Sequence, residues 1–119
     1  MVVFGHGGLD EASLSGPSEL RLIRGGQVER QRLDPQSLGL SLAPMEALRG
    51  GELEDNARIL EAVLQGKGTQ AQQDVVALNA ALVIWAAGLA ESVEAALPKA
   101  QAAMESGSAH AKLLSLRQA

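Results

Sequence analysis

More than half of the chain, from residue 53 onwards, is patterned for α-helix, and this limits the fold more than any other feature. Apolar residues recur every three to four positions across residues 53–64, opposite a face of charged side chains. Thr69 and Gln72 have the spacing of a capping box, which predicts the start of a second, mostly apolar helix. Ser92 is the expected N-cap of a third helix, and Ser108 is expected to start a short terminal one.

The third predicted helix contains a proline. Pro98 lies six residues after Ser92, where its ring and its missing N–H donor oppose a continuous helix. We therefore expect Pro98 either to kink this helix or to move its start to about Leu97.

The first 33 residues are patterned for β-structure. Met1–Phe4 is a run of bulky apolar residues followed by a glycine-rich segment, which predicts a buried strand that leaves a sheet through a turn. Two glycines, Gly25 and Gly26, separate two alternating segments and can adopt the positive φ angles of a type I′ hairpin turn. The chain thus predicts about three strands followed by four or five helices. A buried strand at residue 1 favours a fragment of a larger sheet.

Composition narrows the class of partner. The formal net charge of −4 argues against nucleic acid or an anionic membrane as the main partner, so a small molecule or a protein is expected. The chain has no cysteine for disulfide or thiolate chemistry, and no apolar segment approaches the ~20 residues of a membrane span. These observations favour a cytoplasmic location.

One segment carries residues suited to chemistry. Asp10 and Glu11 are adjacent carboxylates that follow a glycine-rich loop. Mg²⁺ prefers oxygen ligands and often binds one or two carboxylates together with substrate phosphates. The alternative from local chemistry is that Asp10 caps a helical turn from Glu11 to Leu14, and this capping role is the more common one for such a pair.

A wider set of sequence strings favours the metal site over the helix cap. The strings that carry it are Val2–Gly5, Gly8–Ser13, Gly16–Ser18, Met45–Gly51, Glu54–Ala57, Val63–Gly66 and Asp74–Ala81. In order and spacing this set resembles the catalytic-domain sequence of the anthranilate phosphoribosyltransferase family over nearly the whole chain. Each string is weakly specific, but their combination is specific.

The resemblance implies a function and a fold. It implies an α/β fold, with residues 1–119 as a single partial catalytic domain, the C-terminal fragment of a phosphoribosyltransferase or nucleoside-phosphorylase-like domain. Within it, residues 1–33 would hold the strand, the metal-binding loop and the hairpin, and residues 34–119 would be mainly helical. Asp10 and Glu11 would bind the Mg²⁺ that accompanies phosphoribosyl pyrophosphate (PRPP), and anthranilate would be the acceptor, in tryptophan biosynthesis.

The family's pyrophosphate loop and its anthranilate-binding arginine are expected upstream of this chain. No catalytic residue is therefore assigned, and the isolated chain is expected to be inactive. Two alternatives remain at this stage. One is another protein of the same fold, either a nucleoside phosphorylase, against which the Gly8–Glu11 segment weighs, or an anthranilate-type paralogue with another acceptor. The other is a non-catalytic module that binds a partner or self-associates through an exposed sheet edge and the apolar helix.

Overall fold

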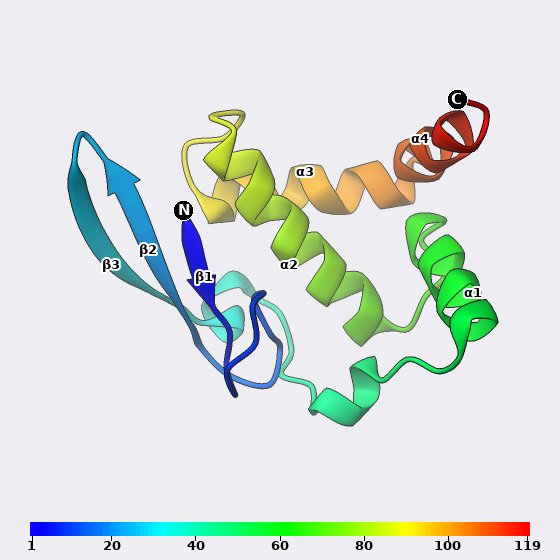
Figure 1. Cartoon of the computed structure of the whole chain (residues 1–119), viewed down its shortest axis with the longest axis horizontal. Coiled ribbons are helices and arrows are strands. Elements are labelled where there is room, and N and C mark those ends of the chain that lie inside the picture. Colours follow the sequence, from blue (N-terminus) through cyan, green and yellow to red (C-terminus); the bar gives the residue numbers. More distant parts are fainter. The chain divides into compact units, whose positions relative to one another are not determined.

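The computed structural model describes residues 1–119 and divides into two compact units, Met1–Ala47 and Leu48–Ala119. Figure 1 shows a small sheet in the first unit and a set of α-helices in the second. The predicted order of three strands followed by helices is confirmed. The elements are β1 (Val2–Phe4), β2 (Ser18–Arg24), β3 (Gln27–Leu33), the 3₁₀ helices η1 (Pro35–Leu38) and η2 (Met45–Leu48), α1 (Leu53–Leu64), α2 (Gln70–Ala86), α3 (Val93–Glu105) and α4 (Ser108–Arg117).

The first unit is organised by a three-stranded antiparallel sheet in the order β1-β2-β3. Gly25 and Gly26 form the predicted two-residue turn, with φ angles of 56° and 78°, so the hairpin prediction is confirmed. Alternate residues of β2 and β3 share one face, on which Leu20, Leu22 and Leu33 are buried.

The opposite face of this sheet is exposed, and we call it the arginine face. Directly paired residues of antiparallel strands lie on the same face, so the strand register defines its members. They are the apolar residues Val2, Phe4, Ile23 and Val28 and the charged residues Glu19, Arg21, Arg30 and Arg32.

The prediction of a buried strand at the start of the chain is wrong for this structure. β1 is an edge strand that pairs only with β2, and Val2 and Phe4 are 43% and 53% exposed. The ring of Phe4 is covered in part by the guanidinium of Arg21, 5.9 Å from the ring centroid. A three-residue strand with one neighbour leaves one edge and one face uncovered, and this is the reason for its exposure.

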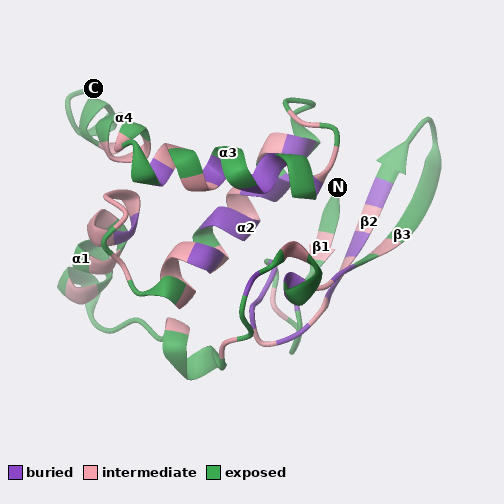
Figure 2. Ribbon diagram, turned by 180° about the vertical axis from the view of Figure 1, so that it is seen from behind, coloured by how far each residue is buried: buried purple, intermediate pink, exposed green.

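The second unit is built on α2 and α3, which pack against each other (Figure 1). α2 begins with the predicted capping box: Gln72 donates its backbone N–H to the Thr69 hydroxyl over 3.2 Å, and Thr69 N–H donates to the Gln72 side chain over 3.0 Å. Figure 2 shows that the buried residues of this unit are concentrated on these two helices. They are Ala77, Leu78, Ala81, Leu82 and Trp85 of α2 and Val93, Ala96, Leu97, Ala100 and Met104 of α3.

Pro98 does not shift the start of α3. The helix begins at Val93, and Ser92 caps it by accepting a hydrogen bond from Ala95 N–H over 3.2 Å. Pro98 itself is exposed. The cap and the burial of Val93 stabilise the first turn, so the missing N–H donor of Pro98 is tolerated inside the helix.

The predicted apolar face of α1 is exposed. Leu53 and Leu60 are 78% and 51% exposed, and Val63 is the one buried residue of this helix. Periodicity correctly identified the helix, but an apolar stripe is buried only where another element covers it.

The terminal helix α4 is attached to α1 by a cluster of polar side chains. His110 Nε2 lies 3.3 Å from Glu61 Oε1 and 3.1 Å from the side-chain nitrogen of Gln65. Arg117 forms an ion pair with Glu61 over 3.4 Å. The hydrogen bonds from His110 and Arg117 hold the pKa of the Glu61 carboxyl below its ordinary value of 4.5.

This pKa shift predicts a sign for the effect of pH on α4. A lowered folded-state pKa means that the ionised Glu61 stabilises the contact above about pH 4.5, and that this contribution is lost as pH falls through the lowered value. We expect NMR titration of the Glu61 carboxyl carbon to give a midpoint below 4.5, and replacement of either His110 or Arg117 with Ala to raise it. A wild-type midpoint at or above 4.5 would contradict this prediction.

Candidate metal-binding loop

The loop that follows β1 is closed by backbone contacts around Gly5. Gly5 N–H donates to the Leu9 carbonyl over 2.8 Å, and Gly8 N–H donates to the Gly5 carbonyl over 3.1 Å. Gly5 is buried, and a Cβ at this position would overlap the carbonyl oxygen of Glu11 and lie 2.8 Å from the Leu9 Cβ. The end of β1 therefore touches the chain on both sides of Asp10.

The exit of the loop is anchored in the first unit. Ala12 and Leu14 are fully buried, and Ser13 is 1% exposed. The Ser13 hydroxyl accepts a hydrogen bond from Ser15 N–H over 3.0 Å and lies 2.7 Å from the Ser15 hydroxyl. Ser13 N–H donates over 3.4 Å to the hydroxyl of Ser18, the first residue of β2. These contacts hold the segment after Glu11 in one position.

Between these two anchors, Asp10 and Glu11 are both exposed and lie in a bend. No helix forms from Glu11 to Leu14, so the capping turn that was the alternative interpretation is absent from the structure. The chain contains no group of three or more His, Cys, Asp or Glu side chains that could hold a metal ion. Two neighbouring carboxylates suit a Mg²⁺ ion that takes its other ligands from water and phosphate oxygens.

The entry and exit of the loop meet at His6 and Gly16. A Cβ at Gly16 would lie 2.5 Å from His6 Nδ1, so the His6 ring rests against the Gly16 backbone. His6 is otherwise exposed. Its contact in the structure is thus with the loop itself.

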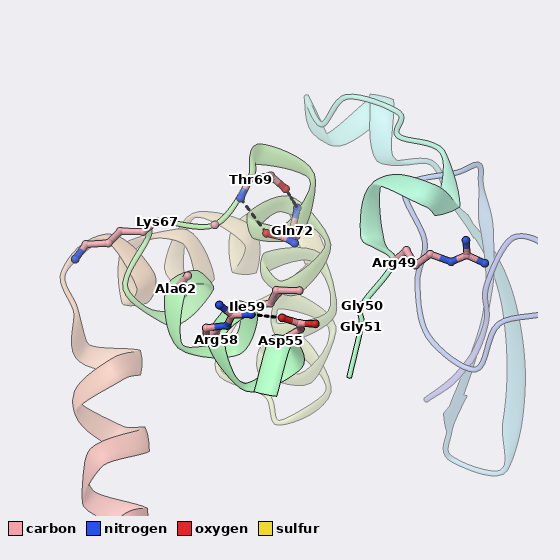
Figure 3. Close-up of a pocket in the computed structure, with 11 residues that line it drawn as sticks. Arg49, Gly50, Gly51, Asp55, Arg58, Ile59, Ala62, Lys67, Thr69 and Gln72 are labelled. Atoms are coloured by element: carbon pink, nitrogen blue, oxygen red, sulfur yellow. Dashed lines mark hydrogen bonds and ion pairs between the residues drawn. The ribbon is translucent and has the colours of Figure 1, made fainter. Parts of the chain in front are cut away.

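A separate open hollow of about 550 Å³ lies in the second unit, between α1 and the start of α2. It is lined by Arg49, Arg58 and Lys67 among others, but its cationic groups do not converge (Figure 3). Arg58 is paired with Asp55, and the side chains of Arg49 and Lys67 extend away from it. Gly66–Thr69 links α1 and α2. Because its cationic side chains do not converge, the hollow adds no further set of ligands to the chain.

Residues 1–110 match the family model described as glycosyl transferase family, a/b domain. The chain belongs to this family. Among curated relatives in it, the anthranilate phosphoribosyltransferase of Synechococcus sp. (strain RCC307) is 56% identical over 107 residues, which cover 90% of this chain and 31% of that protein. The chain spans about a third of the length of the curated relatives it matches. The resemblance inferred from the sequence strings is confirmed.

Solved structures of the same glycosyl transferases share this fold. The anthranilate phosphoribosyltransferase of Thermus thermophilus superposes with a TM-score of 0.79 at 35% identity, covering 91% of this chain and 31% of that one. The Saccharomyces cerevisiae enzyme in complex with PRPP and Mg gives 0.81 at 28% identity, covering 93% and 32%. The predicted α/β fold class is therefore confirmed, while the boundaries of the predicted single domain stay a prediction.

Sequence reasoning identified the acidic pair and missed the residues that hold it. The contact of Gly5 with Glu11 and the hydrogen bonds of Ser13 depend on how the loop folds back. The clustering of Gly5, Gly7 and Gly8 after a strand was the available signal, because close backbone approach is one reason for glycine in such a place.

Proposed function

We propose that this chain is part of an anthranilate phosphoribosyltransferase, which transfers the phosphoribosyl group of PRPP to anthranilate in tryptophan biosynthesis. In this proposal residues 1–119 form one partial catalytic domain of a cytoplasmic enzyme. The observation that supports it most is the 56% identity to the Synechococcus enzyme, maintained over 90% of the chain. No helix combines the length and hydrophobicity that a membrane crossing requires.

Within this enzyme we assign to Asp10 and Glu11 the role of holding Mg²⁺ against the pyrophosphate of PRPP. When bound, the metal neutralises charge that develops on the pyrophosphate leaving group. Both carboxylates are exposed in the bend of a loop that backbone hydrogen bonds close, so each is accessible to a phosphate-bound ion. A Saccharomyces cerevisiae enzyme of this family has been solved in complex with PRPP and Mg, which supports the choice of metal.

The transfer itself needs positioning more than proton chemistry. The anthranilate nitrogen forms a bond to the ribosyl anomeric carbon, the bond from that carbon to the pyrophosphate oxygen breaks, and the nitrogen releases one proton to solvent. An aromatic amine is neutral near pH 7, so no strong general base is required. The part of the enzyme represented here supplies the acidic loop, and the acceptor site is proposed to lie elsewhere in the enzyme.

A chimaeric enzyme tests this function. The 107-residue segment of the Synechococcus sp. (strain RCC307) enzyme that matches this chain would be replaced with the matching part of this chain. We expect the chimaera to phosphoribosylate anthranilate, measured by the loss of anthranilate fluorescence, and the isolated 119-residue chain to be inactive. A well-folded chimaera that accepts PRPP but uses another acceptor would favour a paralogue, and turnover by the isolated chain would contradict its assignment as an incomplete enzyme.

We also propose that the isolated chain self-associates. The arginine face exposes four large apolar side chains, and the outer edge of β1 has no partner strand within the chain. Ile23 and Val28 at the tip of the hairpin are 56% and 60% exposed. Exposed apolar patches and unpaired strand edges both favour association.

Light scattering tests this prediction. The isolated chain is expected to form dimers or larger species at micromolar concentration, and replacement of Phe4 and Ile23 with Ser is expected to shift the mass towards the monomer. Replacing Leu89, which is exposed in the second unit, with Ser is the matched control. A strictly monomeric, well-folded wild-type chain would contradict self-association.

A further inference from the structure

We infer that Gly5 is a positioning residue for the acidic pair, because its lack of a side chain lets the end of β1 press against the backbone of Glu11. This inference rests on the proposed metal-binding role of Asp10 and Glu11. It adds a residue that binds nothing itself but sets the direction in which the two carboxylates leave the loop.

Gly5 contacts the chain on both sides of the pair. Its N–H is bonded to the Leu9 carbonyl, on the chain just before Asp10. The space where its Cβ would stand is occupied by the carbonyl oxygen of Glu11. Any side chain at residue 5 must therefore displace the backbone that carries the second carboxylate.

The loop has little freedom to absorb such a displacement after Glu11. Ala12 and Leu14 are fully buried, and Ser13 is held through its hydroxyl and its N–H. Because the exit is fixed, a push at Glu11 has to be taken up by rotation of the peptides around Asp10 and Glu11. Rotation there changes the separation of the two carboxylates.

A second contact closes the same loop from the other end. The His6 ring lies against Gly16, where a Cβ would come within 2.5 to 2.8 Å of three ring atoms. Unlike the Glu11 carbonyl, the His6 side chain is exposed and can move. We therefore expect Gly16 to matter less than Gly5, and its effect to depend on His6.

Binding of Mn²⁺ alone to the 119-residue chain, followed by the electron paramagnetic resonance signal of the free ion, tests this role without catalysis. We expect Gly5→Ala to weaken Mn²⁺ binding at least about tenfold, in the range seen when supporting residues of metal sites are replaced. Gly7→Ala is the matched control. It lies in the same loop, and its positive φ of 76° makes alanine strained there, but an added Cβ meets no neighbour within 4 Å. Its effect on Mn²⁺ binding should stay below about threefold, because the strain falls on residue 7 itself and the added Cβ displaces no neighbouring backbone.

The double variant Asp10→Asn, Glu11→Gln separates the two proposals. If it abolishes binding while Gly5→Ala binds as tightly as wild type, the positioning role is overturned and the metal site stands. If the double variant binds like wild type, or the wild-type chain binds no Mn²⁺, the metal site fails and the positioning role with it. Equal weakening by Gly5→Ala and Gly7→Ala would also overturn the role of Gly5, because it would point to general loop strain.

If circular dichroism shows that Gly5→Ala does not fold, Gly16→Ala tests whether closure of the loop positions the acidic pair. We expect this variant to weaken Mn²⁺ binding by about threefold to tenfold, less than the loss of a directly supporting residue. The added change His6→Ala is expected to restore binding by removing the ring that the new Cβ strikes. Unchanged Mn²⁺ binding in Gly16→Ala would overturn the view that closure of this loop positions the pair. So would a failure of the added His6→Ala change to restore binding.

Discussion

Replacing Asp10 with Asn and Glu11 with Gln in the chimaeric enzyme is expected to lower the rate of anthranilate phosphoribosylation at least about 100-fold at saturating Mg²⁺. Removal of one preorganised group that stabilises developing charge typically lowers kcat by about 10²–10³. The substitutions keep the size of both side chains and remove only their charge, and both residues are exposed, so folding should be unaffected. Initial rates across a Mg²⁺ titration provide the measurement.

The control for this experiment removes the same charge elsewhere. Glu52 and Glu54 are exposed acidic residues at the start of α1, and their replacement with Gln changes the net charge by the same amount. We expect this variant to keep its rate within about twofold, as is usual for surface substitutions. An unchanged Mg²⁺ dependence in the Asp10 and Glu11 variant would contradict the assignment of these two residues as metal ligands.

Replacing Leu78 with Ala is expected to destabilise the helical unit by about 2–5 kcal/mol. Leu78 is fully buried in α2, the helix that supplies much of the core against α3. Small domains are stable by only about 5–15 kcal/mol, so this loss is a large part of the total. Trp85 is the single tryptophan and lies in the same helix, so its fluorescence during urea unfolding reports on this unit.

Val83 provides the matched control for Leu78, since it lies in α2 but is 68% exposed. Replacing Val83 with Ala leaves no cavity and should change the free energy of unfolding by less than about 0.5 kcal/mol. If both variants lower the urea midpoint equally, lost packing of Leu78 would be ruled out as the cause, since alanine favours the helix at both positions.

Local patterns predicted the elements of this protein well because their causes are local. The hairpin turn at Gly25 and Gly26 follows from the backbone angles that glycine permits. The starts of α2 and α3 follow from hydrogen bonds made by Thr69 and Ser92 within a few residues. The acidic pair was found as two adjacent carboxylates after a glycine-rich segment, and its interpretation as a metal site came from the family resemblance.

Burial could not be predicted in the same way. The strand at Val2–Phe4 and the apolar stripe of α1 both have the pattern of core elements, yet both are largely exposed. An apolar pattern indicates which face of an element is suited to burial. Whether that face is buried depends on another element packing against it, through contacts distant in sequence.

By itself the sequence determined the order of strands and helices, the turn of the hairpin, the capping of two helices and the family to which the chain belongs. The tertiary structure decided which apolar faces are covered, that Pro98 is accommodated within α3, and that the acidic loop adopts a bend with no helical turn. It also revealed that Gly5 lies against Glu11. These features depend on the close approach of backbone segments and on packing between elements, and neither leaves a periodic signal in the sequence.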